Sequence, residues 1–160
     1  MFEWFTVSRS MILAAIVVPL AGFTLSGLTS AAATEEAGVR VALNAYLDGH
    51  KTGQAESFRR AFHPDARMLF VRDGQFVKTE IADYIARAPG KPADDEDKRR
   101  RSIDSIDIVG DAAIAKITLD YPDVTFTDYM TLLKINGEWR IVSKVFSADR
   151  SKAASKGNKS

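Results

Sequence analysis

The sequence predicts an α+β domain in which three N-terminal helices pack in the concave face of a strongly bent antiparallel sheet. Apolar residues recur at helical spacing in the first half of the chain and alternate at strand spacing in the second half. Near the C-terminus, Asn136-Gly137 fits a type I′ turn, which joins two antiparallel strands. The chain has 160 residues, 46% of them hydrophobic, which suffices for a single core.

Residues 1–33 have the layout of a secretory signal peptide and are excluded from the predicted fold. A short start with Arg9 precedes an uncharged apolar segment over Met11–Leu25, and small residues then lead to Ala31-Ala32-Ala33. This order predicts cleavage near Ala33 and export to the periplasm or the exterior. The alternative is an uncleaved N-terminal membrane anchor, which Pro19 and the short apolar length disfavour. The absence of cysteine excludes disulfides and thiolate catalysis.

Amphipathic patterns predict three helices, over residues 35–48, 54–62 and 80–88. The apolar stripe of the first helix ends at Tyr46, and Gly49 is expected to end the helix. Thr79 is expected to cap the third helix. Pro64 and Pro89 follow the second and third helices, which they cannot continue.

Six strands complete the predicted domain, over residues 66–72, 75–78, 102–109, 112–121, 126–135 and 138–146. Strict alternation in the last strand places Trp139, Ile141, Ser143 and Val145 on one face, with Arg140, Val142, Lys144 and Phe146 on the other. The domain is therefore expected to span residues 34–148. Residues 149–160 lack an apolar period and are predicted to be a disordered basic tail.

The charge balance gives no long-range field for nucleic acid or an anionic membrane. The net charge is +1, from 22 basic and 21 acidic residues. The basic run Lys98–Arg101 directly follows the acidic run Asp94–Asp97, so solvated, mutually paired charges are expected there. The two histidines, His50 and His63, lack metal-ligand spacing, and neither a metal site nor another cofactor is predicted.

The element order resembles that of the nuclear-transport-factor-two-like superfamily, and most of all its putative lumazine-binding and polyketide-cyclase-like groups. The resemblance covers residues 35–148 and rests on three segments: Phe62-His-Pro-Asp-Ala66, Tyr129–Lys134 and Gly137–Phe146. It implies a cystatin-like cone fold with a pocket at the open end, and a homodimer formed through the outer sheet face. Superfamily members include isomerases, dehydratases and non-catalytic binding domains, so the fold does not assign the chemistry.

Aromatic residues are the candidate pocket lining: Tyr46, Phe70, Tyr84, Tyr121, Tyr129 and Trp139. They either fill the core or surround a small apolar or aromatic molecule. His63 and Asp65 are weak candidates for acid–base catalysis, and the alternative is a structural corner between helix and strand.

Three hypotheses follow for the function. The first is an exported small-molecule-binding domain without catalysis. The second is an isomerase, dehydratase or cyclase, and the third is a homodimerising domain with a filled cone, for which Val142 and Phe146 would supply outer apolar groups.

Overall fold

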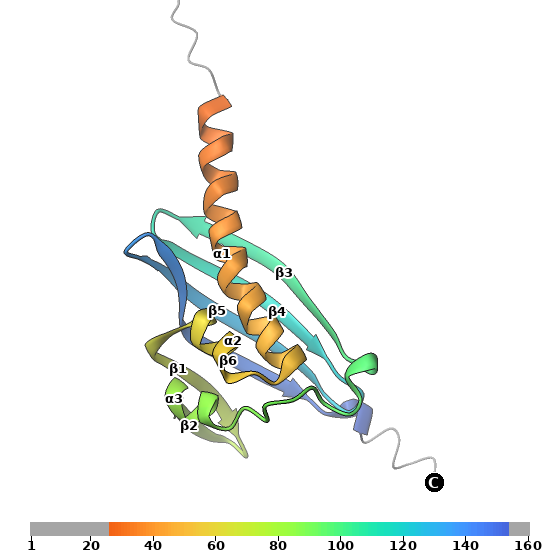
Figure 1. Ribbon diagram of the computed structural model, residues 1–160. Helices are drawn as coiled ribbons and strands as arrows, with labels where there is room; N and C mark the ends of the chain where they lie inside the picture. The colour runs from red at the N-terminus through yellow and green to blue at the C-terminus, as the bar shows by residue number, and fades with distance from the viewer. Residues whose placement is uncertain (1–25, 154–160) are drawn as a thin grey trace, which may run out of the picture.

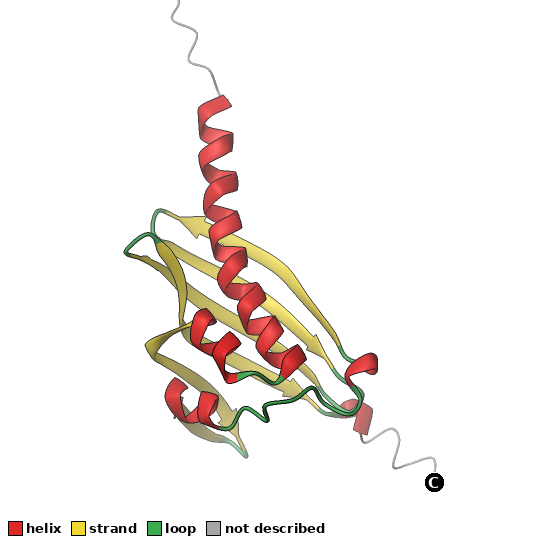
Figure 2. Ribbon diagram, in the orientation of Figure 1, coloured by secondary structure: helices red, strands yellow, loops and turns green. Residues whose placement is uncertain are grey.

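The computed structural model describes residues 26–153 and shows a six-stranded sheet with helices on one face (Figures 1 and 2). The helices are α1 (Ser26–Thr52), α2 (Ala55–Ala61), α3 (Ile81–Ala86) and the 3₁₀ turn η1 (Glu96–Lys98). The strands are β1 (Phe62–Arg72), β2 (Gln75–Glu80), β3 (Arg100–Val109), β4 (Ala112–Asp120), β5 (Thr125–Ile135) and β6 (Glu138–Asp149). The sheet order is β2-β1-β6-β5-β4-β3, antiparallel except between β1 and β6. The predicted α+β class is confirmed.

Helix α1 crosses the concave face of the sheet (Figure 1) and buries the predicted stripe of Val39, Ala42, Leu43 and Tyr46. The prediction that Gly49 ends the helix is wrong. Gly49 lies inside α1, against the ring of Phe58 in α2. A Cβ added at Gly49 would be 2.6 Å from this ring, so the absence of a side chain lets α1 and α2 pack closely. The C-terminal glycine is Gly53, which has φ +72° and donates its N–H to the carbonyl of Gly49.

A β-bulge in β6 overturns the predicted alternation of its second half. Between the pairs Thr131–Ser143 and Leu132–Ile141, β6 has one more residue than β5, so Val142 has no partner there. Trp139 and Ile141 are buried as predicted, but Lys144 and Phe146 also turn to the concave face, and Val145 is exposed on the convex face. Phe146 therefore does not contribute to an outer apolar surface.

The other predicted elements differ from the structure at their ends. Helix α3 begins at Ile81 and Thr79 belongs to β2, so Thr79 is not its cap. The turns at Asp73-Gly74 and Asn136-Gly137 are confirmed, with positive φ at all four residues. At the C-terminus, β6 includes Asp149 and residues 151–153 form a helical turn, so the predicted disordered tail starts too early.

The predicted signal peptide falls mainly outside the described residues. Residues 26–33 form the first turns of α1, and the first buried core residue is Val39. Among the described residues, no helix combines the length and the apolar character needed to cross a membrane. Residues 154–160 also lie outside the described part of the chain.

Candidate functional site

A pocket of about 760 Å³ opens where the C-terminal end of α1 meets α2, α3 and the loop over residues 87–99. Its lining combines apolar side chains with two aromatic polar groups, His50 and Tyr84, and with charged residues of the loop. We call it the histidine pocket, and it is lined by Gly49, His50, Gly53, Phe58, Tyr84, Arg87, Ala88, Pro89, Lys91, Pro92, Ala93, Asp94, Asp95 and Arg99.

His50 joins two tyrosine hydroxyls at the floor of the histidine pocket. Its Nε2 lies 3.1 Å from the Tyr84 hydroxyl, and its Nδ1 lies 3.2 Å from the Tyr121 hydroxyl. The imidazole also makes edge contacts with the rings of Tyr46 and Phe58, at centroid distances of 4.7 and 5.3 Å. Both ring nitrogens are thus engaged, and the ring cannot turn without breaking these contacts.

His50 is neutral at physiological pH. Burial lowers the pKa of the imidazole well below 6.5, and the positive charge of Lys144 lowers this pKa further. A neutral imidazole has one N–H donor and one acceptor nitrogen, so one tyrosine donates to the ring and the other accepts from it. The accepting tyrosine keeps its own hydroxyl hydrogen free for a third group.

Arg101 makes Tyr121 the stronger donor of the two tyrosines. Its guanidinium lies 5.2 Å from the centre of the Tyr121 ring, and it opposes the effect of burial, which raises the pKa of Tyr121. Burial also raises the pKa of Tyr84, which the charge of Asp128 raises further. The favoured arrangement therefore has Tyr121 donating to His50, His50 donating to Tyr84, and Tyr84 presenting its O–H to the pocket.

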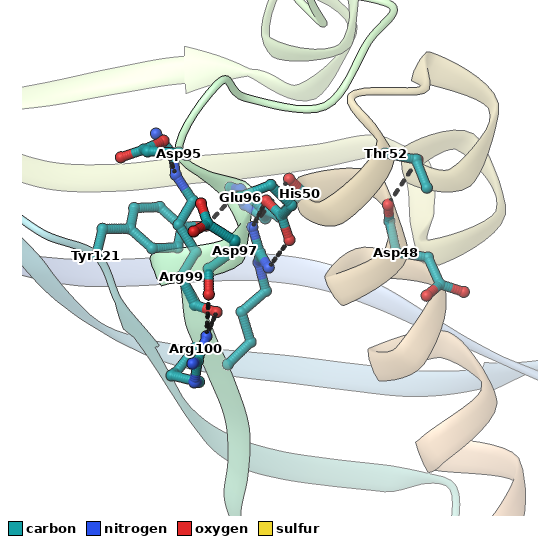
Figure 3. Close-up of polar contacts among 10 residues, drawn as sticks. Asp48, His50, Thr52, Asp95, Glu96, Asp97, Arg99, Arg100 and Tyr121 are labelled. Carbon is teal, nitrogen blue, oxygen red and sulfur yellow. Dashed lines mark hydrogen bonds and ion pairs between the residues drawn. The ribbon is translucent and has the colours of Figure 1, made fainter.

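The charged run over residues 94–101, which ends in the first residues of β3, holds the pocket loop in place. Arg99 pairs with Asp95 at 2.8 Å and lies 4.4 Å from the Tyr121 ring centre (Figure 3). Arg101 pairs with Glu96 at 2.6 Å. Arg101 also donates to the backbone carbonyl of His50. The predicted mutual pairing is confirmed at these two arginines, but the Arg101 side chain is only 9% exposed. This part of the run is therefore a brace between the loop and α1.

A buried polar triad lies behind His50. The Tyr46 hydroxyl donates to Asp128 Oδ2 at 2.6 Å and accepts from Lys144 Nζ, also at 2.6 Å. Lys144 Nζ lies 3.0 Å from the same carboxylate oxygen, and both charged side chains are almost completely buried. Burial lowers the pKa of Lys144, and the Asp128 carboxylate opposes this effect. Asp128 Oδ1 is buried without a hydrogen-bond partner.

The six predicted pocket residues separate into four places. Tyr46, Tyr84 and Tyr121 gather around His50. Phe70 lines a different pocket, between β1 and β6, and Trp139 donates to Glu35 near the start of α1. The expectation that Tyr129 faces the interior is wrong, because it is 57% exposed on the convex face.

His63 and Asp65 lie at the start of β1, outside the histidine pocket. Their side chains are 3.8 Å apart, and the Asp65 N–H donates to His63 Nδ1. The Asp65 side chain is 91% exposed, and His63 lines a shallow hollow with Pro64 and residues of α3. This geometry is that of a corner between helix and strand.

Three important residues were missed as site candidates: His50, Asp128 and Lys144. His50 follows Tyr46 by one helical turn, so the apolar stripe already pointed it inward. Asp128 alternates with the buried Met130 and Leu132, which also indicated an inward position. Lys144 gave no such signal, because the bulge at Val142 reverses its face. The described residues contain no group of three potential metal ligands.

The domain is similar to a known protein family and to several solved structures. Residues 34–147 match the model of a family described as putative lumazine-binding. An NTF2-like protein of unknown function from Shewanella baltica OS155 is 29% identical, with a TM-score of 0.66 over 73% of this chain and 95% of that chain. A similar protein from Methylobacillus flagellatus KT is 28% identical, with a TM-score of 0.63 over 72% of this chain and 93% of that chain.

The comparisons also include a protein named for an activity. Aldolase FrzH from Cladobotryum sp is 28% identical over 106 residues, which are 63% of this chain and 81% of that protein.

The buried triad predicts an unusual pattern of stability changes. Lys144→Met leaves the Asp128 carboxylate buried without its cation, which should lower the free energy of unfolding by about 3–5 kcal/mol. The double variant Asp128→Leu/Lys144→Met removes both charges and should be more stable than Lys144→Met alone. Urea denaturation measures the wild type and both variants, and a double variant less stable than Lys144→Met would contradict the ion pair.

The lowered pKa of His50 predicts a loss of stability in mild acid. The unfolded chain takes up a proton near pH 6.5 while the folded chain resists it, so stability is retained above that pH and falls below it. The slope approaches about 1.4 kcal/mol per pH unit. His50→Gln should show a shallower loss between about pH 6.5 and 5. If the free energy of unfolding, measured by denaturation at each pH, fell equally with pH in the wild type and in His50→Gln, His50 would not be held neutral in the folded chain.

Proposed function

This chain belongs to the putative lumazine-binding family of NTF2-like proteins, and on this basis we propose that its histidine pocket binds a small molecule through a carbonyl oxygen. The observation that carries the proposal is that the two ring nitrogens of His50 lie within hydrogen-bond distance of the Tyr84 and Tyr121 hydroxyls at the pocket floor. Fold membership alone does not supply this assignment, because NTF2-like folds serve many roles.

The free Tyr84 hydroxyl explains why a carbonyl is the preferred ligand group. Tyr84 lines the histidine pocket and presents its O–H there when it accepts from His50. A carbonyl oxygen can accept this hydrogen, whereas a group that can only donate leaves the hydroxyl unsatisfied. Phe58, Ala88 and Pro92 provide apolar contacts for the remainder of the ligand. The best fit is a compact carbonyl compound with an apolar or aromatic body.

Acid–base catalysis is the second candidate function. A carbonyl that accepts from Tyr84 becomes more electrophilic, and its α-protons become more acidic, as enolisation and aldol reactions require. The similarity to aldolase FrzH favours this candidate. The acid would then be Tyr84, oriented by His50, in place of His63 and Asp65, and the α-proton would pass to solvent water in the open pocket.

We also propose that the convex sheet face forms a homodimer. Ile114, Tyr129 and Val145 are exposed there on three neighbouring strands, and Tyr129 and Val145 are cross-strand partners. An apolar patch that spans several strands is typical of an interface between identical chains.

Export remains part of the proposal. Residues 31–33, which flank the proposed cleavage site, are exposed, and the first buried residue of the described core is Val39. Mass spectrometry of the N-terminal peptide of the native protein tests the proposed cleavage, and an intact Met11–Leu25 segment would refute it.

Tyr84→Phe tests the proposed binding mode directly. Acetophenone is the probe, because it combines a carbonyl with an aromatic body, and ethylbenzene is its counterpart without an acceptor. Loss of one hydrogen bond should weaken acetophenone binding roughly two- to tenfold while leaving ethylbenzene binding unchanged. Ligand-observed NMR titration measures both affinities.

Tyr129→Phe is the matched control, since it removes the same hydroxyl from the convex face. Its affinities should equal those of the wild type. Equal acetophenone binding by the Tyr84→Phe variant would refute the proposed carbonyl contact. Exchange of the acetophenone methyl protons in D2O, if catalysed by the wild type and lost in Tyr84→Phe, would favour the enzymatic candidate.

The proposed homodimer predicts that Val145→Glu yields a monomer. A carboxylate within the apolar patch would be desolvated on association. Light scattering coupled to size-exclusion chromatography measures the mass of both proteins. A wild-type chain that remains monomeric at high concentration would contradict the interface.

A further inference from the structure

A second pocket lies where β1 and β6 separate. Their parallel pairing runs as far as Phe70–Phe146, and beyond it β1 continues with β2 while β6 continues with β5. The resulting hollow has a volume of about 900 Å³. We call it the phenylalanine pocket, after the three rings that form its floor: Phe70, Phe126 and Phe146.

The floor of the phenylalanine pocket is an aromatic surface that the protein leaves partly uncovered. Phe146 lies 4.6 Å from Phe70, with 33° between the ring planes, and 6.0 Å from Phe126. All three rings are only half-buried, whereas Met130 and Leu132 on the same concave face are completely buried. Covering these rings with a flat apolar group would remove aromatic surface from water.

Positive charge surrounds this aromatic floor. The Arg72 guanidinium lies 5.1 Å from the centre of the Phe70 ring, and Arg150 also lines the pocket. The ammonium of Lys144 lies 4.8 Å from the Phe146 ring centre, but it is paired with the Asp128 carboxylate and does not line the pocket. The lining residues include one carboxylate, that of Asp73. The balance of charge therefore favours a ligand with a negative group.

The phenylalanine pocket is distinct from the histidine pocket. The two have no lining residue in common. They are separated by Tyr121 and Phe126, whose rings are in edge contact at 6.0 Å. Tyr121 holds His50 on one side of this wall, and Phe126 forms part of the aromatic floor on the other.

We propose that the phenylalanine pocket is a second binding site, specific for an aromatic carboxylate. The ligand ring packs against the uncovered edges of Phe70, Phe126 and Phe146, and its carboxylate pairs with Arg72 and Arg150. An aliphatic acid would cover the rings less completely, and a neutral aromatic compound would leave both guanidinium groups without an anion. This site is independent of carbonyl binding at Tyr84.

Calorimetric titration with 2-naphthoate tests the second site, and 2-naphthamide serves as the neutral compound of the same shape. The wild type should bind the carboxylate roughly three- to tenfold more tightly than the amide, as two partly exposed ion pairs provide. In Arg72→Gln/Arg150→Gln the two affinities should become nearly equal. Both substitutions are at the pocket rim and spare the core.

Two further variants locate the binding. Phe70→Leu keeps an apolar side chain but removes an aromatic edge from the pocket floor, so it should weaken both compounds. Tyr84→Phe alters only the histidine pocket and should leave 2-naphthoate binding unchanged. Absence of saturable 2-naphthoate binding, an unchanged preference in the double arginine variant, or loss of 2-naphthoate binding in Tyr84→Phe would each overturn the proposal.

Discussion

The arrangement of the interior depends on the single extra residue that β6 carries at Val142. Without this bulge, strict alternation would direct Lys144 and Phe146 to the convex face. With it, Lys144 reaches Tyr46 and Asp128, and Phe146 joins the aromatic floor beside Phe70. A second bulge, at Asp104 in β3, adds to the bending of the sheet around α1. This one register change thus places Lys144 in the buried triad and Phe146 in the phenylalanine pocket.

The buried ion pair links the structural interior to the chemistry of the histidine pocket. Burial of Lys144 and Asp128 carries a desolvation cost that two apolar residues would avoid. The charge of Lys144 helps to keep His50 neutral, and the charge of Asp128 raises the pKa of Tyr84. The neutral imidazole in turn allows Tyr84 to present its hydroxyl to a ligand. The triad therefore has an electrostatic effect on the pocket floor besides tying α1 to β5 and β6.

Local patterns in the sequence were sufficient for the fold and for part of the site. Helical spacing identified the buried face of α1, and the Asn136-Gly137 turn fixed the β5–β6 hairpin. Helical spacing from Tyr46 also predicts an inward position for His50, and alternation with Met130 and Leu132 predicts one for Asp128. These patterns could not reveal Lys144, because a bulge has no reliable local signature, nor the role of Gly49, which depends on the distant Phe58 ring. Contacts between remote segments set these features.

The proposed site depends on a neutral His50 that hydrogen-bonds to two tyrosines at the base of an open pocket. A long-range ¹H–¹⁵N NMR spectrum of the His50 ring tests this most directly, because it distinguishes a protonated from an unprotonated nitrogen. We expect one fixed neutral tautomer at pH 7, with Nε2 protonated and Nδ1 accepting from Tyr121. An imidazole protonated on both nitrogens at pH 7, or one exchanging freely between tautomers, would contradict the proposed site.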